Sequence, residues 1–330
     1  MTYNSDFVIS LVEPVSALAE VVDLSDPRLV RHQEQVAYIA LAIAEELRLP
    51  SYEQCQIALA GELHDIGFLS LEDRLKFTEQ TFEVNETYNH ELIGYALLRK
   101  LDPLKEAADM IRFHHLPWNN GKGKTVNGID VPLGSHIINL ADRIAVSIDR
   151  RKDVLGQADA ITERISNYSG TLFHPDVVKA FLSLSRMEYF WLDASSSYCG
   201  RIVQRKLEPL NIWLNMRDLI MLAEVFAQII DFRSPFTAQH SSGVAATAGA
   251  LARLAGFSAN ECQLIQVAGY LHDIGKLAIP GNILEKPCEL DETEKRIMKS
   301  HVYYTYHTLE NIHGFETINT WASLFFHFGL

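Results

Sequence analysis

A repeated segment constrains the fold of this chain more than any other feature of its sequence. Residues 61–67, Gly-Glu-Leu-His-Asp-Ile-Gly, recur as residues 269–275, Gly-Tyr-Leu-His-Asp-Ile-Gly, at an offset of 208 residues. Further histidines correspond between the two copies, His32 with His240 at the same offset, and His90 with His301 and His114 with His327 after small differences in length. Such a long period predicts a duplicated site rather than a stacked array of short repeats.

The chain is predicted to be helical nearly throughout. Apolar residues recur at three- and four-residue spacing in residues 36–47, 53–63, 90–101 and 177–184, and sustained strand alternation is absent. A length of 330 residues with 48% hydrophobic content favours about two domains. The predicted fold class is therefore all-α, with two tandem helical bundles in residues 1–205 and 206–330.

Local signals indicate where the helices are interrupted. Pro50 breaks one helical pattern, and Ser51 is expected to cap the next helix. Residues 119–132 are rich in Gly and Asn and are predicted to form the clearest long loop. A domain boundary is expected near residues 195–208, followed by a long helix over residues 210–231.

Composition excludes several classes of protein. The chain has 42 acidic against 29 basic residues, so it lacks the basic footprint of a protein that binds polymeric nucleic acid. Its four cysteines show no CxxC pairing, which argues against a disulfide scaffold and a thiolate zinc site. No signal peptide or membrane span is evident, and a cytoplasmic protein without a membrane partner is expected.

The histidines and aspartates of the repeat are candidate metal ligands. Imidazoles and carboxylates without thiolates suit iron, manganese or zinc, with iron and manganese favoured here. A lone His-Asp pair arises often by chance, but its duplication with matched upstream histidines favours a metal role. The candidate ligands of the first copy are His32, His64, Asp65, His90, His114, His115 and Asp142, and those of the second copy are His240, His272, Asp273, His301 and His327.

Such a ligand set predicts two divalent metal ions in a complete site. An Asp beside a His can bridge two cations, which would activate a bridging water to hydroxide and clamp phosphoryl oxygens during in-line attack. The predicted chemistry is hydrolysis of a phosphoester. Four other histidines, His136, His174, His307 and His313, lie outside the repeated scheme and are expected to be surface or core residues.

Several segments resemble the HD superfamily of metal-dependent phosphohydrolases, and specifically the bacterial HD-GYP group associated with cyclic di-GMP hydrolysis. In the second copy the resemblance is carried by residues 272–280 (HDIGKLAIP), 283–287 (ILEKP) and 298–301 (MKSH). In the first copy it extends through residues 131–133, 137–143 and 169–175. The resemblance implies two tandem HD bundles and makes Asp142 the closing metal ligand of the first site.

Both copies depart from the HD-GYP pattern. Phe68 stands where the second copy has the signature lysine, Lys276, and the expected HHExxDGxGYP becomes HHLPWNNGKGK at residues 114–124. Lys122 and Lys124 of this segment are weaker candidates for contact with substrate phosphate, and Arg143 is a weaker candidate for that contact or for pairing with a carboxylate. The second copy ends three residues after His327 and is expected to be incomplete at its C-terminus, either because the sequence is a fragment of a longer protein, which is favoured, or because the module itself is truncated.

The predicted function is hydrolysis of a phosphodiester, with cyclic di-GMP or a related cyclic dinucleotide as the small phosphorylated substrate. Asp65 and Lys276 are the predicted catalytic residues. The alternative is a degenerate HD signalling module that binds a nucleotide or a protein partner without turnover, an interpretation favoured by Phe68 and the lost Tyr-Pro. The sequence is also compatible with a homodimer or with a signalling-protein partner.

Overall fold

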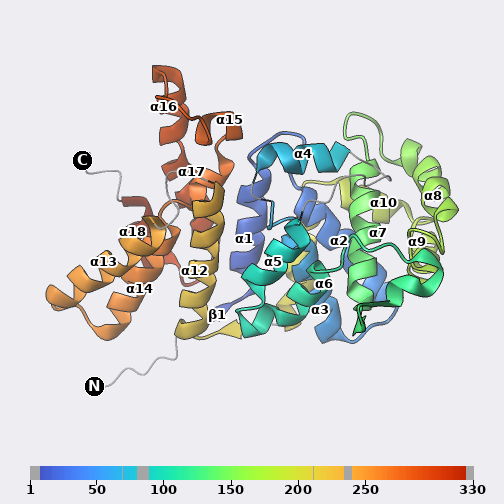
Figure 1. The fold of residues 1–330 in the computed structure, drawn as a ribbon, viewed down its shortest axis with the longest axis horizontal. Coiled ribbons are helices and arrows are strands. Elements are labelled where there is room, and N and C mark those ends of the chain that lie inside the picture. The colour runs from blue at the N-terminus through green and yellow to red at the C-terminus, as the bar shows by residue number, and fades with distance from the viewer. Residues whose placement is uncertain (1–7, 69, 80–88, 211, 234–239, 325–330) are drawn as a thin grey trace. The chain divides into compact units, whose positions relative to one another are not determined.

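The computed structural model describes residues 8–68, 70–79, 89–210, 212–233 and 240–324 (Figure 1). These residues are mainly helical, with four strands of two residues each, which confirms the all-α prediction. The chain forms two compact units, and each is considered by itself. The central unit comprises Arg31–Phe68 and Glu72–Leu210, and the terminal unit comprises Met1–Val30, Leu69–Leu71 and Asn211–Leu330. The structure thus groups residues 1–30 with the second copy, whereas the sequence places them with the first.

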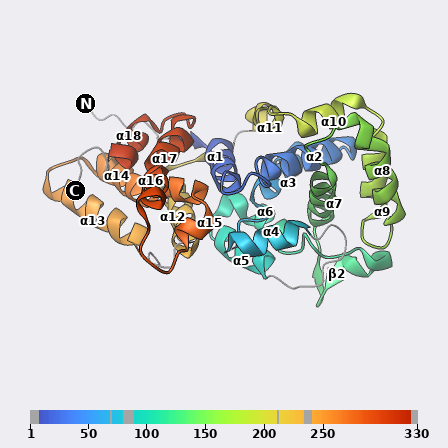
Figure 2. The ribbon, with the colours of Figure 1, turned by 90° about the horizontal axis from the view of Figure 1, so that it is seen from above.

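The central unit is organised around two buried helices, α2 (His32–Glu46) and α3 (Ser51–Leu63). Helix α2 is buried over most of its length and packs against α3, α7, α9 and α11; Figure 2 shows it beside α3. Helices of this unit with an apolar face include α7, α8 and α9. Besides α2 and α3, the unit contains α4 (Leu71–Glu79), α5 (His90–Leu98), η1 (Asp102–Leu104), α6 (Lys105–Ile111), η2 (Asn119–Lys124), α7 (Leu133–Ser147), η3 (Leu155–Gln157), α8 (Ala158–Asn167), α9 (Pro175–Leu184), α10 (Glu188–Ser195), α11 (Cys199–Leu207) and η4 (Glu208–Leu210).

The terminal unit contains the helices of the second copy and the segment that precedes the first. Strand β1 (Ile9–Ser10) pairs antiparallel with β4 (Trp213–Leu214), and helix α1 (Val12–Asp23) packs against α17 and η5. Burial of the apolar side of α1 in these contacts explains why residues 1–30 group with the second copy. The other helices are α12 (Met216–Arg233), α13 (His240–Leu254), α14 (Ala259–Leu271), η5 (Ile274–Ala278), α15 (Gly281–Leu284), α16 (Glu292–Lys299), α17 (His301–Glu310) and α18 (Glu316–Leu324).

Two sequence predictions about helix starts are wrong. The helix expected from residue 210 begins only at Met216, because residues 213–214 pair with β1 and the Asn215 side chain accepts hydrogen bonds from the backbone of Arg217 and Asp218. Ser51 is not a cap: α3 begins at Ser51 itself, Pro50 occupies the N-cap position, and no side-chain cap bond forms. A Pro before the first helical residue is compatible with helix initiation without a side-chain cap.

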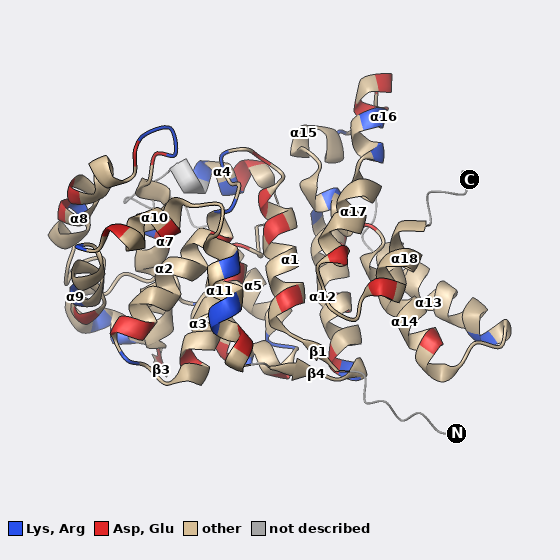
Figure 3. Ribbon diagram, turned by 180° about the vertical axis from the view of Figure 1, so that it is seen from behind, with Lys and Arg blue, Asp and Glu red and all other residues tan. Residues whose placement is uncertain are grey.

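Charged residues of both signs occur along the described helices, as Figure 3 shows. Helix α16 buries none of its residues, and its local chemistry accounts for its helicity. Asp291 and Glu294 form a reciprocal capping box, acidic side chains lie in the first turn, and Arg296 and Lys299 lie in the last turn. Both arrangements complement the helix dipole. No helix among the described residues is long and apolar enough to cross a membrane.

The repeat in the sequence is also a repeat in helix packing. A Cβ on Gly61 would lie 2.8 Å from the Cα of Ala37 on α2, and a Cβ on Gly269 of α14 would lie 2.7 Å from the Cα of Ala245 on α13. These distances are shorter than real Cβ contacts, so only glycine allows the two helices to approach in this way. The last glycine of each motif lies equally close to the backbone at the start of a later helix: a Cβ on Gly67 would meet the carbonyl oxygen of His90, the first residue of α5, at 2.0 Å. For Gly275 the corresponding distance to the oxygen of His301 is 1.9 Å.

Residues 119–132 are more ordered than the loop predicted from sequence. They form a 3₁₀ segment, η2 (Asn119–Lys124), followed by the hairpin strands β2 (Thr125–Val126) and β3 (Ile129–Asp130). Asn127 and Gly128 both have positive φ, 51° and 77°, as a two-residue type I′ turn requires. The Asn-Gly pair was the sequence signal for this hairpin, but its flanking strands are too short to show alternation.

His136 of α7 lies beneath this segment. It is buried, its Nε2 lies 3.3 Å from the carbonyl oxygen of Gly123, and its ring meets the Trp118 ring edge-on. Burial and the neighbouring His174 lower the pKa of His136 to about 4. The imidazole is therefore a neutral core residue at neutral pH, whereas the sequence left open whether it lies at the surface or in the core.

The close approach at Gly61 yields a stability prediction. Replacing Gly61 with Ala is expected to destabilise the protein by roughly 1–3 kcal/mol, because the added methyl group meets backbone atoms of α2. Gly243, in α13, provides a matched control, since a Cβ there meets nothing within 4 Å. Gly243→Ala is expected to stabilise by about 0.5–1 kcal/mol. Urea unfolding followed by circular dichroism measures both changes, and equal effects of the two substitutions would contradict this account.

The lowered pKa of His136 predicts a pH dependence of stability. Between its unfolded pKa and about pH 4, the unfolded chain binds a proton that the folded protein does not, so this residue lowers the stability as the pH falls. At pH 5 the loss amounts to about 1–2 kcal/mol. Urea unfolding at pH 7 and pH 5 should therefore show a smaller loss for His136→Gln than for the unchanged protein. An identical loss in both proteins would show that His136 titrates alike in the folded and unfolded states.

Candidate metal centre

The seven predicted ligands of the first copy lie together inside the central unit. They come from helix termini and one helix interior: His32 begins α2, His90 begins α5, and Asp142 lies within α7. His64 and Asp65 follow α3, and His114 and His115 follow α6. Their donor atoms form two groups, each with all atoms within 4.8 Å of one another. One group is Asp65, His90, His114 and His115, and the other is His32, His64 and Asp142.

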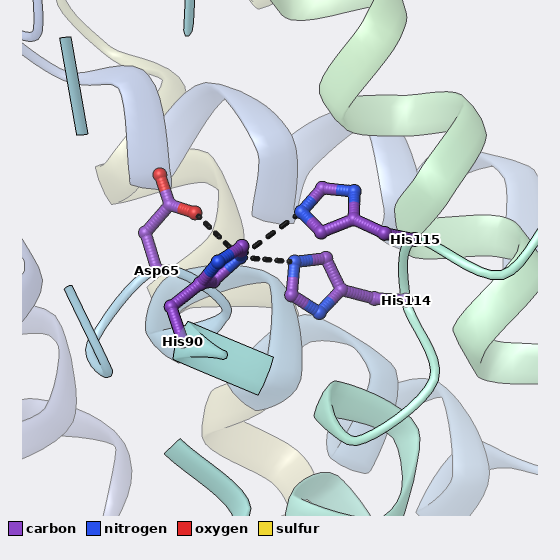
Figure 4. Close-up of side chains that lie close together, drawn as sticks. All are labelled: Asp65, His90, His114 and His115. Atoms are coloured by element: carbon purple, nitrogen blue, oxygen red, sulfur yellow. Dashed lines mark hydrogen bonds and ion pairs between the residues drawn. The ribbon is translucent and has the colours of Figure 1, made fainter. Parts of the chain in front are cut away.

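In the first group, three imidazoles point toward one another beside a carboxylate (Figure 4). The Nε2 atom of His90 lies 3.0 Å from that of His115 and 3.4 Å from that of His114. Oδ1 of Asp65 lies 3.9 Å from the same His90 nitrogen. Nitrogen and oxygen donors from four side chains thus converge on one region.

In the second group, two imidazoles face Oδ1 of Asp142. The Nε2 of His32 lies 3.3 Å from this oxygen, and the Nε2 of His64 lies 3.9 Å from it. Asp65 contacts both groups, because its Oδ1 lies 3.3 Å from His64 and its Oδ2 lies 3.8 Å from His32. Asp65 therefore has the position of a carboxylate shared between two donor sets.

Backbone carbonyl groups orient the histidines so that Nε2 carries the lone pair. Nδ1 of His64 lies 2.9 Å from the oxygen of Gly61, and Nδ1 of His114 lies 2.6 Å from the oxygen of Ile111. A carbonyl oxygen only accepts, so each Nδ1 must donate its hydrogen, which leaves Nε2 unprotonated in the neutral ring. This outer-shell arrangement is typical of histidines that bind metals.

The ionisation states suit metal ligands. Burial and the adjacent imidazoles lower the pKa of His114 to about 3 and keep the pKa of His115 well below its usual value, so both rings are neutral. Burial alone would raise the pKa of the carboxyls, but the neighbouring groups outweigh it. His64 and Arg74 hold the pKa of Asp65 below its usual range, and Arg143 and His32 do the same for Asp142.

These residues fit divalent metal ions on the chemistry of the donor set. Imidazole nitrogens and buried carboxylate oxygens that converge in this way are the donors that a divalent cation binds. Each aspartate also has a buried arginine on its Oδ2: Arg74 Nε lies 3.2 Å from Asp65, and Arg143 Nη2 lies 2.8 Å from Asp142. The sequence analysis expected Arg143 near a carboxylate or phosphate but missed Arg74, which lies in no recognisable motif.

The second copy brings together a smaller cluster within the terminal unit. His240, His272 and Asp273 have donor atoms within 4.8 Å of one another, and His301 Nε2 lies 3.4 Å from Oδ1 of Asp273. Carbonyl oxygens of Gly269 and Met298 orient His272 and His301 as in the first copy. The His240 side chain is 46% exposed, against 6% for His32, so this cluster is more open to solvent. His327, the remaining predicted ligand, lies outside the described residues.

Phe68 and Lys276 use their equivalent positions differently. The Phe68 ring stacks on the ring of His90, with centroids 3.9 Å apart and planes at 14°. Lys276 instead places Nζ 2.6 Å from Oδ2 of Asp273. Stacking fixes the orientation of an imidazole, whereas the ammonium group offsets the charge of a carboxylate.

The other predicted positions lie outside these clusters. Lys122 and Lys124 are exposed on η2, and neither forms part of the two metal-ligand groups. Of the histidines outside the repeated scheme, His174 caps α9 by accepting from the backbone of Asp176. His307 and His313 pair with Glu310 and Glu13 at the surface.

Both copies match known protein families. Residues 29–147 and residues 224–324 each match a family model described as an HD domain. A crystal structure of a cyclic GMP-AMP specific phosphodiesterase from Vibrio cholerae, V-cGAP3, superposes with a TM-score of 0.66 at 23% identity. The match covers 96% of this chain and 83% of that structure, and it shows a common fold.

Three curated relatives extend the comparison. The 3′3′-cGAMP-specific phosphodiesterase 1 of Vibrio cholerae serotype O1 is 27% identical over 329 residues, covering 97% of this chain and 75% of the relative. The 3′3′-cGAMP-specific phosphodiesterase 3 of the same organism is 29% identical over 258 residues (74% and 54%). A cyclic di-GMP phosphodiesterase of Thermotoga maritima is 29% identical over 195 residues (56% and 51%). The chain thus spans three quarters of the first relative and about half of the other two. With two HD domains and these relatives, the chain belongs to the HD superfamily of phosphohydrolases.

Proposed function

We propose that this protein is a metal-dependent phosphodiesterase that hydrolyses a cyclic dinucleotide, 3′3′-cGAMP or cyclic di-GMP, at the site of the central unit. The observation that carries the proposal is the convergence of five histidines and two aspartates in two donor groups that both contact Asp65, with every one of these side chains except His115 buried. The substrate class is taken from the relatives, one of which is similar to this chain over nearly its whole length.

Two divalent ions, with iron or manganese favoured and zinc allowed, would be held by the two donor groups. Asp65, His90, His114 and His115 would hold one ion, and His32, His64 and Asp142 the other, with Asp65 in contact with both groups. Divalent ions in such a site supply Lewis acidity toward phosphoryl oxygens and activate water as a nucleophile.

The side chains around the ligands maintain this arrangement. The carbonyl groups of Gly61 and Ile111 hold two imidazoles with Nε2 directed inward, and Phe68 covers one face of His90. Arg143 offsets the charge of Asp142, and its 3% side-chain exposure favours this role over direct contact with substrate. The exposed ammonium groups of Lys122 and Lys124 remain candidates for binding substrate phosphate.

The second cluster is proposed as a subsidiary metal site. Lys276 lies against the aspartate of that cluster, where it can stabilise negative charge. The His240 side chain is almost half exposed, so this site shields bound ions from water less than the first. We therefore assign turnover to the first site. A homodimer or a signalling-protein partner stays a prediction of the sequence, for which light scattering of the purified chain is the direct measurement.

Substitution of the ligands tests the proposal. His64→Ala/Asp65→Ala is expected to remove metal from the first site and to lower turnover of 3′3′-cGAMP and cyclic di-GMP at least roughly 100-fold, since the donor groups share Asp65. His272→Ala/Asp273→Ala should lower the metal content with a smaller effect on turnover. Elemental analysis measures the metal, and chromatography of the reaction measures product.

A surface histidine provides the control. His307→Ala removes a solvent-exposed ion pair with Glu310 and should leave metal content and turnover unchanged. If the unchanged protein, loaded with iron or manganese, binds the dinucleotide without forming product, the proposed hydrolysis is wrong and the degenerate binding module is favoured. Absence of bound metal after loading would overturn the metal site itself.

A further inference from the structure

Each of the two equivalent aspartates has one oxygen held by a cation, but the cations come from different places. In the second copy Lys276, three residues after Asp273, lies 2.6 Å from its Oδ2. In the first copy the Nε of Arg74, nine residues after Asp65, lies 3.2 Å from the corresponding Oδ2. The same carboxylate oxygen is thus engaged in both units.

Phe68 explains why the cation of the first copy comes from elsewhere. It stands at the position of Lys276, and its ring packs flat against His90. Arg74 belongs to the following helix, α4, and its side chain has no exposed surface. A guanidinium group is buried to this extent only beside negative charge, because the loss of hydration is otherwise too costly.

We propose that Arg74 is the cation of the first site, relocated from the position of Lys276 to helix α4, and that it holds one oxygen of Asp65 and leaves the other for metal. The remaining oxygen, Oδ1, is the one that faces His64 and His90, at 3.3 and 3.9 Å. Arg74 is a positioning residue in this scheme, since it acts through Asp65. The inference rests on the proposed function, in that the cluster holds divalent ions.

If Arg74 serves as the cation of the first site, its removal should change metal binding in the opposite direction from the loss of an arginine needed only for packing. A fixed positive charge beside Asp65 repels an incoming divalent ion, so its removal should tighten metal binding. The loss of an arginine needed only for packing would loosen the cluster and weaken metal binding. The cation hypothesis also predicts that a lysine in place of Phe68, at the position equivalent to Lys276, can replace Arg74.

The test uses the full chain with the second cluster removed by His272→Ala/Asp273→Ala. In this background Arg74→Met, the exchanged variant Phe68→Lys/Arg74→Met, and Lys76→Met are compared. Lys76 lies on the same helix, where it is 54% exposed and paired with Glu72, so its substitution removes a cation of α4 that lies outside the cluster. Metal-free proteins are titrated with Mn²⁺, and the free ion is followed by electron paramagnetic resonance.

Arg74→Met is expected to bind Mn²⁺ about tenfold more tightly than the background protein. The exchanged variant should bind Mn²⁺ with an affinity within about threefold of that of the background protein. Lys76→Met should match the background protein. With dinucleotide substrate, Arg74→Met should lower kcat about tenfold or more with little change in KM, because Asp65 loses its orientation. The exchanged variant should recover most of this loss.

Unchanged or weaker Mn²⁺ binding by Arg74→Met, or an exchanged variant that resembles Arg74→Met, overturns the proposal. If Arg74→Met does not fold, the exchanged variant decides: a folded protein with the background affinity supports the proposal, and an unfolded or metal-free one overturns it. A background protein that binds Mn²⁺ but hydrolyses no cyclic dinucleotide refutes the proposed function, while the titration still decides the role of Arg74. Absence of Mn²⁺ binding by the background protein overturns both.

Discussion

The burial of two carboxylates, Asp65 and Asp142, beside each other in the central unit is the interaction on which the rest of the site depends. Both side chains are at most 5% exposed, and both share contacts with His32 and His64. Two negative charges so close together and so far from water require neutralisation. Each carboxylate obtains part of it from a buried guanidinium group on Oδ2, Arg74 for Asp65 and Arg143 for Asp142, while Oδ1 faces imidazoles.

Helix packing places these charges. The glycines of the repeated motif allow α3 to approach α2, and the turn after α3 to approach α5, more closely than any other residue would permit. His32, His64, Asp65 and His90 all lie at the ends of these helices, so the same contacts that form the core bring these candidate ligands together. The terminal unit repeats both contacts, which explains why the glycines and the His-Asp pair recur together.

The two copies differ in how they shield their equivalent aspartates, Asp65 and Asp273, from water and in how they offset the negative charge. The first copy encloses Asp65 with five histidines, a second aspartate and two buried arginines. The second, in the part of the chain that the structure describes, has an exposed His240 and a lysine on the motif itself. Deeper burial raises the free-energy cost of an unpaired charge, and it also strengthens each electrostatic interaction inside the site.

The sequence by itself determined the helical fold class and the duplication, and it brought out the candidate ligands His32, His64, Asp65, His90, His114, His115 and Asp142, because a metal site demands particular residue types and the repeat made their spacing visible. It did not determine the grouping of residues 1–30 with the second copy or the start of α12, since both follow from contacts between segments more than 200 residues apart. The Asn127-Gly128 pair is a local signal for a hairpin turn, but the flanking strands of two residues each are too short to show the alternation of apolar and polar residues that predicts strands. Only the tertiary structure decided which cation Asp65 receives: Phe68 implied a missing charge, and the contact of Arg74 arises from the fold of α4 against the site rather than from any local spacing.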